Sequence, residues 1–203
     1  GEAGVEDERF RKGLKVLLEA ELNKNYAYAV RVIGLAHLYD RLRPEQKQLV
    51  RERLMKDVEW LYKAQSDEGD WNYPGDGYGE LSNTQMALLA INEASKIFTE
   101  LPNDVWKKAM DRYLKTQKDD GGWNYGHRSA VHVNTPPYGS MTAAGVASLM
   151  IARDKLFGAT GCPCRGGESQ MRSHPELDKA IDDGLEWMIR NFAVGENPGK
   201  GEG

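Results

Sequence analysis

Apolar residues recur at helical spacing in two long segments of the chain. The segment from Pro44 to Gln65 has an apolar stripe and an opposite face of charged residues, which predicts an amphipathic helix on the outside of the fold. The segment from 103 to 117 repeats this pattern, and Pro102 and Asn103 mark its start. The two stripes consist of Val50, Leu54, Val58 and Leu61, then Val105, Trp106, Met110, Tyr113 and Leu114.

Each of these segments is followed by a second segment that is apolar or small on nearly all sides. The first runs from Ser82 to Ile91 and the second from Ser140 to Leu149. A helix without a polar face is typical of a buried position, so we expect both to be inner helices. A serine at the start of each predicts an N-cap.

One sequence phrase joins each outer helix to its inner helix. It reads Gln, three turn-forming residues, Gly, any residue and Trp-Asn-Tyr, and its copies at Gln65–Tyr73 and Gln117–Tyr125 lie 52 residues apart. A fixed period of this kind indicates a repeat architecture. The Gln can bond groups of two adjacent helix ends as donor and acceptor, Gly permits a positive φ, and Trp can cover the junction.

The chain is predicted to be a single all-α repeat domain over residues 1–203, with units at about 7–42, 44–99, 102–157 and a partial unit at 175–203. These units amount to three helical hairpins and half of another. Because so few hairpins do not close a ring, we expect an incomplete arrangement, self-association through an unpaired apolar face, or docking to the rest of a longer chain.

Composition narrows the range of partners. The formal net charge of −4 gives no electrostatic reason to expect nucleic acid. No apolar run approaches the about 18 residues that a membrane-spanning helix needs. The two cysteines make no disulfide framework, and the sequence indicates no particular compartment.

The repeated phrase resembles the QW repeat of the terpenoid cyclase and protein prenyltransferase superfamily. The matching residues are Trp60, Leu61, Gln65, Gly69 and Trp71, then Tyr113, Leu114, Gln117, Gly121 and Trp123. The resemblance implies an α/α toroid, with inner helices around a central cavity and outer helices around them. It also implies an apolar or extended ligand on the concave face.

The catalytic motif of the squalene-hopene-type cyclases is absent from the sequence. They hold their acid in an Asp-x-Asp-Asp setting, whereas the nearest strings here, at 67–70 and 119–122, belong to the repeated turns. The inner helices also offer few aromatic residues for stabilising a carbocation. We therefore expect a cyclase-like domain that binds a ligand without a complete catalytic set. Two alternatives stay open: an isoprenoid cyclase whose acid lies outside this segment, and a carbohydrate-active or carbohydrate-binding toroid.

Polar and aromatic residues gather in the loops that lead into the predicted inner helices, and such loops would border the cavity of a toroid. The candidate ligand-binding residues are Asp76, Tyr78, His127, His132 and Tyr138, accompanied by Asn72, Tyr73, Glu80 and Tyr125. His37 lies within an apolar inner segment, where a hydrogen-bonded core histidine is expected.

A metal site is a further candidate. Cys162 and Cys164 lie in a Gly-rich loop with His174 ten residues on, and Asp178 could complete four ligands for Zn²⁺. The spacing differs from that of the prenyltransferase zinc site, and an ordinary turn with two thiols explains it as well. No cofactor is required by the sequence, and zinc is the one metal that it suggests.

Overall fold

The computed structural model describes residues 4–5, 7–73, 79–98, 102–126, 135–158 and 174–199. These residues form seven α-helices and one 3-10 turn, and Trp71 and Glu80 share an isolated antiparallel bridge. The all-α prediction is confirmed. The elements are α1 (Glu8–Glu19), α2 (Asn25–Leu38), η1 (Tyr39–Arg41), α3 (Pro44–Lys63), α4 (Leu81–Ala94), α5 (Asp104–Thr116), α7 (Gly139–Phe157) and α8 (Pro175–Arg190).

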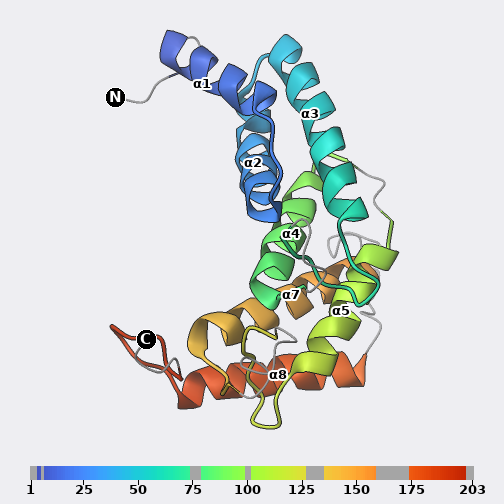
Figure 1. Ribbon diagram of the computed structural model, residues 1–203, viewed down its shortest axis with the longest axis vertical. Helices are drawn as coiled ribbons and strands as arrows, with labels where there is room; N and C mark the ends of the chain where they lie inside the picture. The colour runs from blue at the N-terminus through green and yellow to red at the C-terminus, as the bar shows by residue number, and fades with distance from the viewer. Residues whose placement is uncertain are drawn as a thin grey trace, which may run out of the picture.

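The helices form two layers that follow an open arc (Figure 1). The inner layer is the row α2, α4 and α7, in which α4 packs against both neighbours. The outer layer is α1, α3, α5 and α8, where α3 contacts both α2 and α4, and α8 packs on α7. This alternation of outer and inner helices is the arrangement of an α/α toroid, as the sequence predicts. The two ends of the arc, α1 and α8, lie far apart in Figure 1.

The helix starts are confirmed for the outer layer and corrected for the inner one. Helix α3 begins at Pro44 and α8 at Pro175, where proline's missing N–H costs no hydrogen bond. Neither predicted serine is an N-cap, because α4 and α7 begin before it, after Glu80 and Tyr138. The Glu80 side chain caps α4 by accepting a hydrogen bond from the Asn83 N–H.

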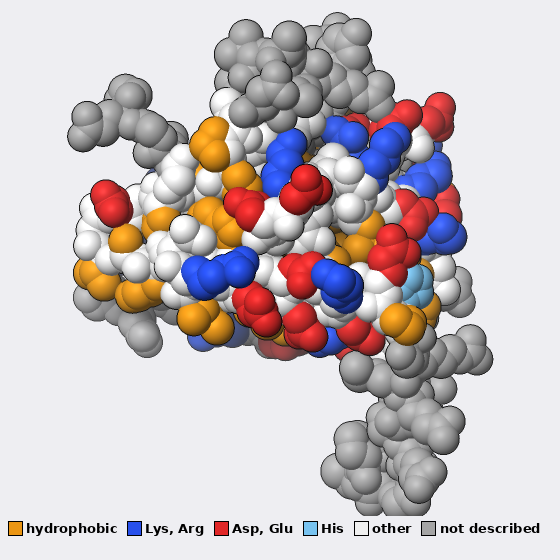
Figure 2. Space-filling view, turned by 90° about the horizontal axis from the view of Figure 1, so that it is seen from below, with side chains coloured by type: hydrophobic (Ala, Val, Ile, Leu, Met, Phe, Trp, Pro, Cys, Tyr) orange, Lys and Arg blue, Asp and Glu red, His pale blue; other side chains and the backbone are white. Residues whose placement is uncertain are grey.

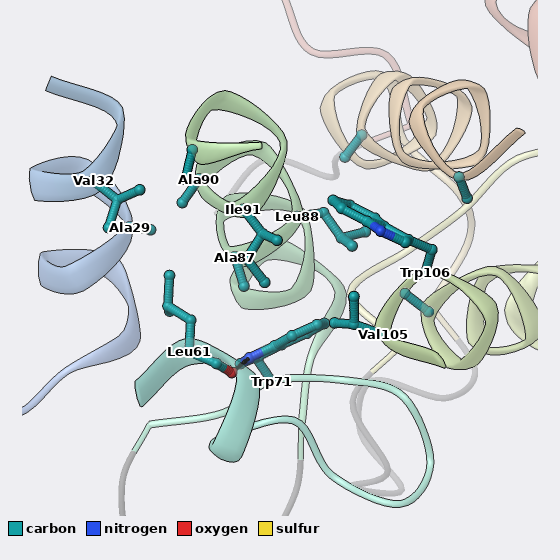
Figure 3. Packing of buried hydrophobic residues seen from close by; sticks show 14 of the residues in the cluster. Ala29, Val32, Leu61, Trp71, Ala87, Leu88, Ala90, Ile91, Val105 and Trp106 are labelled. Carbon is teal, nitrogen blue, oxygen red and sulfur yellow. Dashed lines mark hydrogen bonds between the residues drawn. The ribbon is translucent and has the colours of Figure 1, made fainter. Parts of the chain in front are cut away.

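Two buried tryptophans, one from each copy of the repeated phrase, occupy the junctions between the layers. Trp71 and Trp123 are both 0% exposed. The Trp71 indole donates to the Leu61 carbonyl at 2.6 Å, and the Trp123 indole donates to the Tyr113 carbonyl at 2.9 Å. Figure 3 shows Trp71 beside Leu61, Val105 and the α4 side chains that face it. The equivalent contacts show that the two copies are also structural copies.

The Gln of each phrase ties its turn to the following outer helix. Gln65 Nε2 donates to Gly69 O at 3.2 Å and to Val105 O at 3.0 Å. Gln117 Nε2 donates to Gly121 O at 2.9 Å and to Ala180 O at 2.8 Å. The predicted donor role is confirmed, and the acceptor role stays a prediction.

Each phrase also contains a glycine at positive φ. Gly69 has φ 88° and Gly121 has φ 93°, which confirms the predicted positive φ. The helices end earlier, at Lys63 and Thr116, so these glycines shape the turn and do not stop the helix. Each lies against the backbone of the next outer helix, since an added Cβ would be 2.1 Å from Lys108 O or 2.5 Å from Asp183 O. No larger residue therefore fits at either position without moving α5 or α8.

Two buried ion pairs connect segments distant in sequence. Arg31 of α2 bonds Asp57 of α3 through Nε and Nη2 at 2.7 and 2.8 Å, and it donates from Nη1 to carbonyls near the end of α1. Arg112 of α5 lies 3.0 Å from Asp70, which fills the variable position of the first phrase. Asp70 thus has a structural role, as the sequence interpretation of this turn suggests.

Candidate functional site

The inner helices share a partly exposed apolar face. Val30 of α2 is 58% exposed and Met150 of α7 is 44% exposed. The sequence predicts that the apolar segments at 82–91 and 140–149 are buried, and the structure corrects this for one face, whose side chains are only partly buried. The partly buried residues of this face are Ile33, Met86, Leu89, Ala143 and Ala147.

Contacts at both ends of α2 and α4 fix how their exposed stripes align. Near the N-termini, the Tyr26 hydroxyl donates to Ser82 Oγ at 2.9 Å. Near the C-termini, His37 Nε2 lies 3.6 Å from Glu93 Oε2. The two pairs have the same offset in sequence, so the stripes run side by side in the same direction. We call this surface, which continues onto α7, the inner face.

His37 is therefore not the core histidine that the sequence predicts. Its side chain is 65% exposed at the C-terminal end of the inner face. Its Nδ1 lies 3.0 Å from the Ile33 carbonyl of its own helix, and Glu93 also pairs with Lys96. This end of the inner face is thus polar and open to solvent.

A buried glutamate lies at the opposite end of the inner face. Glu80 is 6% exposed, and its Oε1 accepts hydrogen bonds from Ser82 Oγ, the Asn83 backbone N–H and Asn83 Nδ2. Asn25 of α2 reaches the same asparagine, since its Nδ2 donates to Asn83 O at 2.8 Å. The second carboxylate oxygen, Glu80 Oε2, is buried without a hydrogen-bond partner. Buried polar atoms are normally satisfied, so this unpaired carboxylate oxygen makes Glu80 a candidate for binding a ligand.

Two pairs of tyrosine rings belong to the segments that adjoin this glutamate. The rings of Tyr26 and Tyr73 stack with centroids 6.4 Å apart, and those of Tyr125 and Tyr138 are 6.0 Å apart. Burial, and to a lesser extent the charge of Glu80, raises the pKa of both Tyr26 and Tyr138. Hydrogen bonds connect these tyrosines to the glutamate: Tyr26 donates to Ser82 Oγ, which donates to Glu80 Oε1, and the Tyr125 carbonyl accepts from the N–H of Leu81, the residue after Glu80. We call Glu80, Asn25, Asn83 and the four tyrosines the Tyr–Glu cluster.

The structure brings together only part of the predicted ligand site. Tyr138 belongs to the Tyr–Glu cluster, whereas Asp76, Tyr78, His127 and His132 lie outside the described residues. The sequence did not single out Tyr26, Asn25 or Asn83. The available signal was that Tyr26 starts the inner helix of a degenerate copy, but only packing pairs it with Ser82.

The predicted zinc site stays a prediction. Cys162 and Cys164 lie outside the described residues, and the described ranges contain no group of three metal-binding side chains. His174 is the N-cap of α8, where its Nδ1 accepts from the Leu177 N–H at 3.3 Å. Asp178 forms an ion pair with Arg153 at 3.4 Å.

A larger hollow lies on the outer side, away from the Tyr–Glu cluster. It has a volume of about 760 Å³ between α3 and α5, with Ile91 of α4 and Phe98 in its lining. Among its polar residues, Arg51 covers the Phe98 ring at 4.9 Å and Tyr62 donates to Asp104. No unpaired buried polar atom of the described residues lines it, so the inner face is the better candidate site.

On the face seen in Figure 2, where α8 lies in the foreground, basic and acidic side chains are interspersed with apolar ones and form no extended patch of one sign. None of the described helices is both long and apolar enough to cross a membrane.

No model of a known protein family matches the sequence. Among solved structures, the chain is similar to ent-copalyl diphosphate synthase from Streptomyces platensis, with a TM-score of 0.58 and 18% sequence identity. The similarity covers 84% of this chain and 27% of that enzyme's chain. At this identity the likeness concerns the fold alone, and the chain spans about a quarter of the enzyme's length. This chain therefore shares its helical fold with about a quarter of that enzyme's chain.

Proposed function

We propose that this chain is a terpenoid-cyclase-like domain whose inner face binds an apolar or extended ligand, without a complete catalytic set in the described residues. The observation that carries the proposal is the set of partly exposed apolar side chains on α2, α4 and α7, three helices that pack side by side. Exposed apolar surface of this kind marks ligand grooves and interaction sites. The fold likeness to a terpene cyclase supports the choice of an isoprenoid-like ligand.

The test is native mass spectrometry of the protein with polyprenyl lipids and with oligosaccharides of similar mass. We expect a retained polyprenyl lipid, and we expect Val30→Glu to abolish its retention, because a carboxylate on the inner face is costly to cover with an apolar chain. Leu49→Glu is the matched control, since Leu49 is 56% exposed on the outer helix α3 and Val30 is 58% exposed. Equal loss of lipid in both variants would contradict the proposal.

A carbohydrate ligand is a second candidate, favoured by the tyrosines of the Tyr–Glu cluster. Tyr73 and Tyr125 are 45% and 42% exposed, and exposed aromatic rings beside polar groups can stack on sugars. Oligosaccharide binding without lipid binding in the same panel would select this function. Product formation from a polyprenyl substrate by a longer protein would instead select the isoprenoid cyclase. Stoichiometric Zn²⁺ retention, lost on replacing Cys162 and Cys164, would establish the metal site.

A further inference from the structure

The Tyr–Glu cluster contains three buried polar atoms that lack hydrogen-bond partners. They are Glu80 Oε2, Asn25 Oδ1 and the Tyr138 hydroxyl oxygen. All three can accept a hydrogen bond, and two of them belong to residues that bond the same side chain, Asn83. Glu80 Oε2 and Asn25 Oδ1 can only accept, so both need a donor, whereas the Tyr138 hydroxyl can also donate.

The carboxylate of the cluster has no cationic partner among the described residues. In the part of the chain that the structure describes, Glu80 forms no ion pair with any Lys, Arg or His. Arg112 is buried on α5, which contacts α4, and it is already paired with Asp70. A buried carboxylate without a paired cation is unfavourable, and a bound cation would remove that cost.

The faces of the surrounding tyrosines favour the same kind of ligand. Aromatic rings attract cations through their negative faces, and they do not attract an anion such as a phosphate in this way. An ammonium group has three N–H donors and no acceptor, which matches the two oxygens that can only accept, Glu80 Oε2 and Asn25 Oδ1. An alcohol supplies one donor, and a phosphate supplies negative charge and acceptors that Glu80 would repel.

We propose that the Tyr–Glu cluster binds the primary ammonium head group of an amphipathic ligand, with Glu80 Oε2 accepting from its N–H and its alkyl chain lying along the inner face. This inference rests on the proposed function of that face. Because Glu80 Oε2 is closed to water in the structure, a tyrosine side chain moves when the ligand enters. Tyr73 is a candidate for this movement, since it is 45% exposed, it stacks on Tyr26, and exposed side chains change rotamer readily.

The experiment compares dodecylammonium, 1-dodecanol and dodecyl phosphate by isothermal titration calorimetry. Because the three compounds share the same alkyl chain, its contribution to the binding free energy is equal. The head group therefore determines the order of the affinities. We expect dodecylammonium to bind about tenfold more tightly than dodecanol, the size of one charge-assisted hydrogen bond, and dodecyl phosphate to bind least.

The variant Glu80→Gln keeps an oxygen for the α4 cap and removes the charge. It should lower dodecylammonium affinity about tenfold and leave dodecanol affinity unchanged. Glu93→Gln is the matched control on the same helix, because Glu93 lies at the other end of the inner face and already pairs with Lys96. If Glu80→Gln does not fold, Tyr138→Phe replaces it, since it removes one acceptor and is expected to weaken dodecylammonium binding alone.

The outcomes separate this inference from the proposed function. Equal affinities for the three head groups, or tighter binding of dodecyl phosphate, would overturn the ammonium site and leave the apolar face in place. If no dodecyl compound binds, the proposed function fails. The ammonium site is then tested separately by titrating the protein with butylammonium, which lacks a long alkyl chain. Its Glu80-dependent binding would support the ammonium site, and its failure to bind would overturn it.

Discussion

Replacing Gly121 by alanine should destabilise the protein through two separable effects. The first is backbone strain, because φ is 93° and an L-residue there costs about 1–2 kcal/mol. The second is a clash, because the new Cβ would lie 2.5 Å from Asp183 O and 2.9 Å from Asp183 C. These are backbone atoms of α8, so the whole helix must shift, and overpacking of this kind costs about 1–3 kcal/mol more.

A matched control isolates the clash from the strain. Gly195 has φ 100°, but an added Cβ there meets nothing within 4 Å. We therefore expect Gly195→Ala to cost about 1–2 kcal/mol and Gly121→Ala about 2–5 kcal/mol of unfolding free energy. Gly69→Ala should resemble Gly121→Ala, since its Cβ would lie 2.1 Å from Lys108 O.

The assay is urea unfolding followed by far-ultraviolet circular dichroism, with the free energy of unfolding extrapolated to water. In thermal unfolding, each kcal/mol should lower Tm by about 2–4 °C for a chain of this length. Equal destabilisation by Gly121→Ala and Gly195→Ala would refute the view that close approach of α8 to the repeated turn requires glycine.

Four further predictions concern stability. Gln117→Leu should cost about 1–3 kcal/mol, because it removes two donors that bridge the turn and α8; a cost near zero in urea unfolding would contradict this. Asp57→Asn should cost about 3–5 kcal/mol by leaving Arg31 buried and unpaired, and the loss should persist in high salt, unlike that of a surface pair. Tyr138→Phe should leave the unfolding free energy unchanged or raise it, because the lost hydroxyl has no partner. Stability should fall as the pH rises above 10, because burial raises the pKa of Tyr113 above its ordinary 10.0 and the unfolded chain therefore loses this proton at a lower pH than the folded chain. Tyr113→Phe should flatten the alkaline limb of the pH–stability curve.

The sequence predicts the inner and outer layers of this fold because the same pattern of outer helix, turn and inner helix occurs twice. Two phrases with the same internal spacing specify a turn with Gly at positive φ, a covering Trp and a bridging Gln. The structure confirms the positive φ at Gly69 and Gly121 and equivalent hydrogen bonds of the Trp in both copies. The starts of α3 and α8 at Pro44 and Pro175 follow from proline's fixed φ and missing N–H. These features depend on neighbours along the chain, which a sequence displays directly.

The inner-helix caps and His37 show where sequence interpretation fails. Ser82 has the chemistry of an N-cap, but Glu80 takes that position because it also bonds Asn83. His37 looks like a core residue within an apolar segment, yet it is exposed because the outer helices cover only the other side of α2. Burial of an all-apolar helix depends on which of its faces has a partner, and periodicity does not state this.

The sequence by itself therefore determined the repeat, the hairpins and the loops that carry polar residues, including Tyr138. Only the tertiary structure decided which of these residues meet. Asn25 bonds Asn83 across 58 positions, and Arg31 pairs with Asp57 across 26. Neither separation follows from a helical period, because each depends on how adjacent helices align after packing. The unpaired oxygen of Glu80 is likewise a property of the folded chain, since only burial removes the water that would otherwise satisfy it.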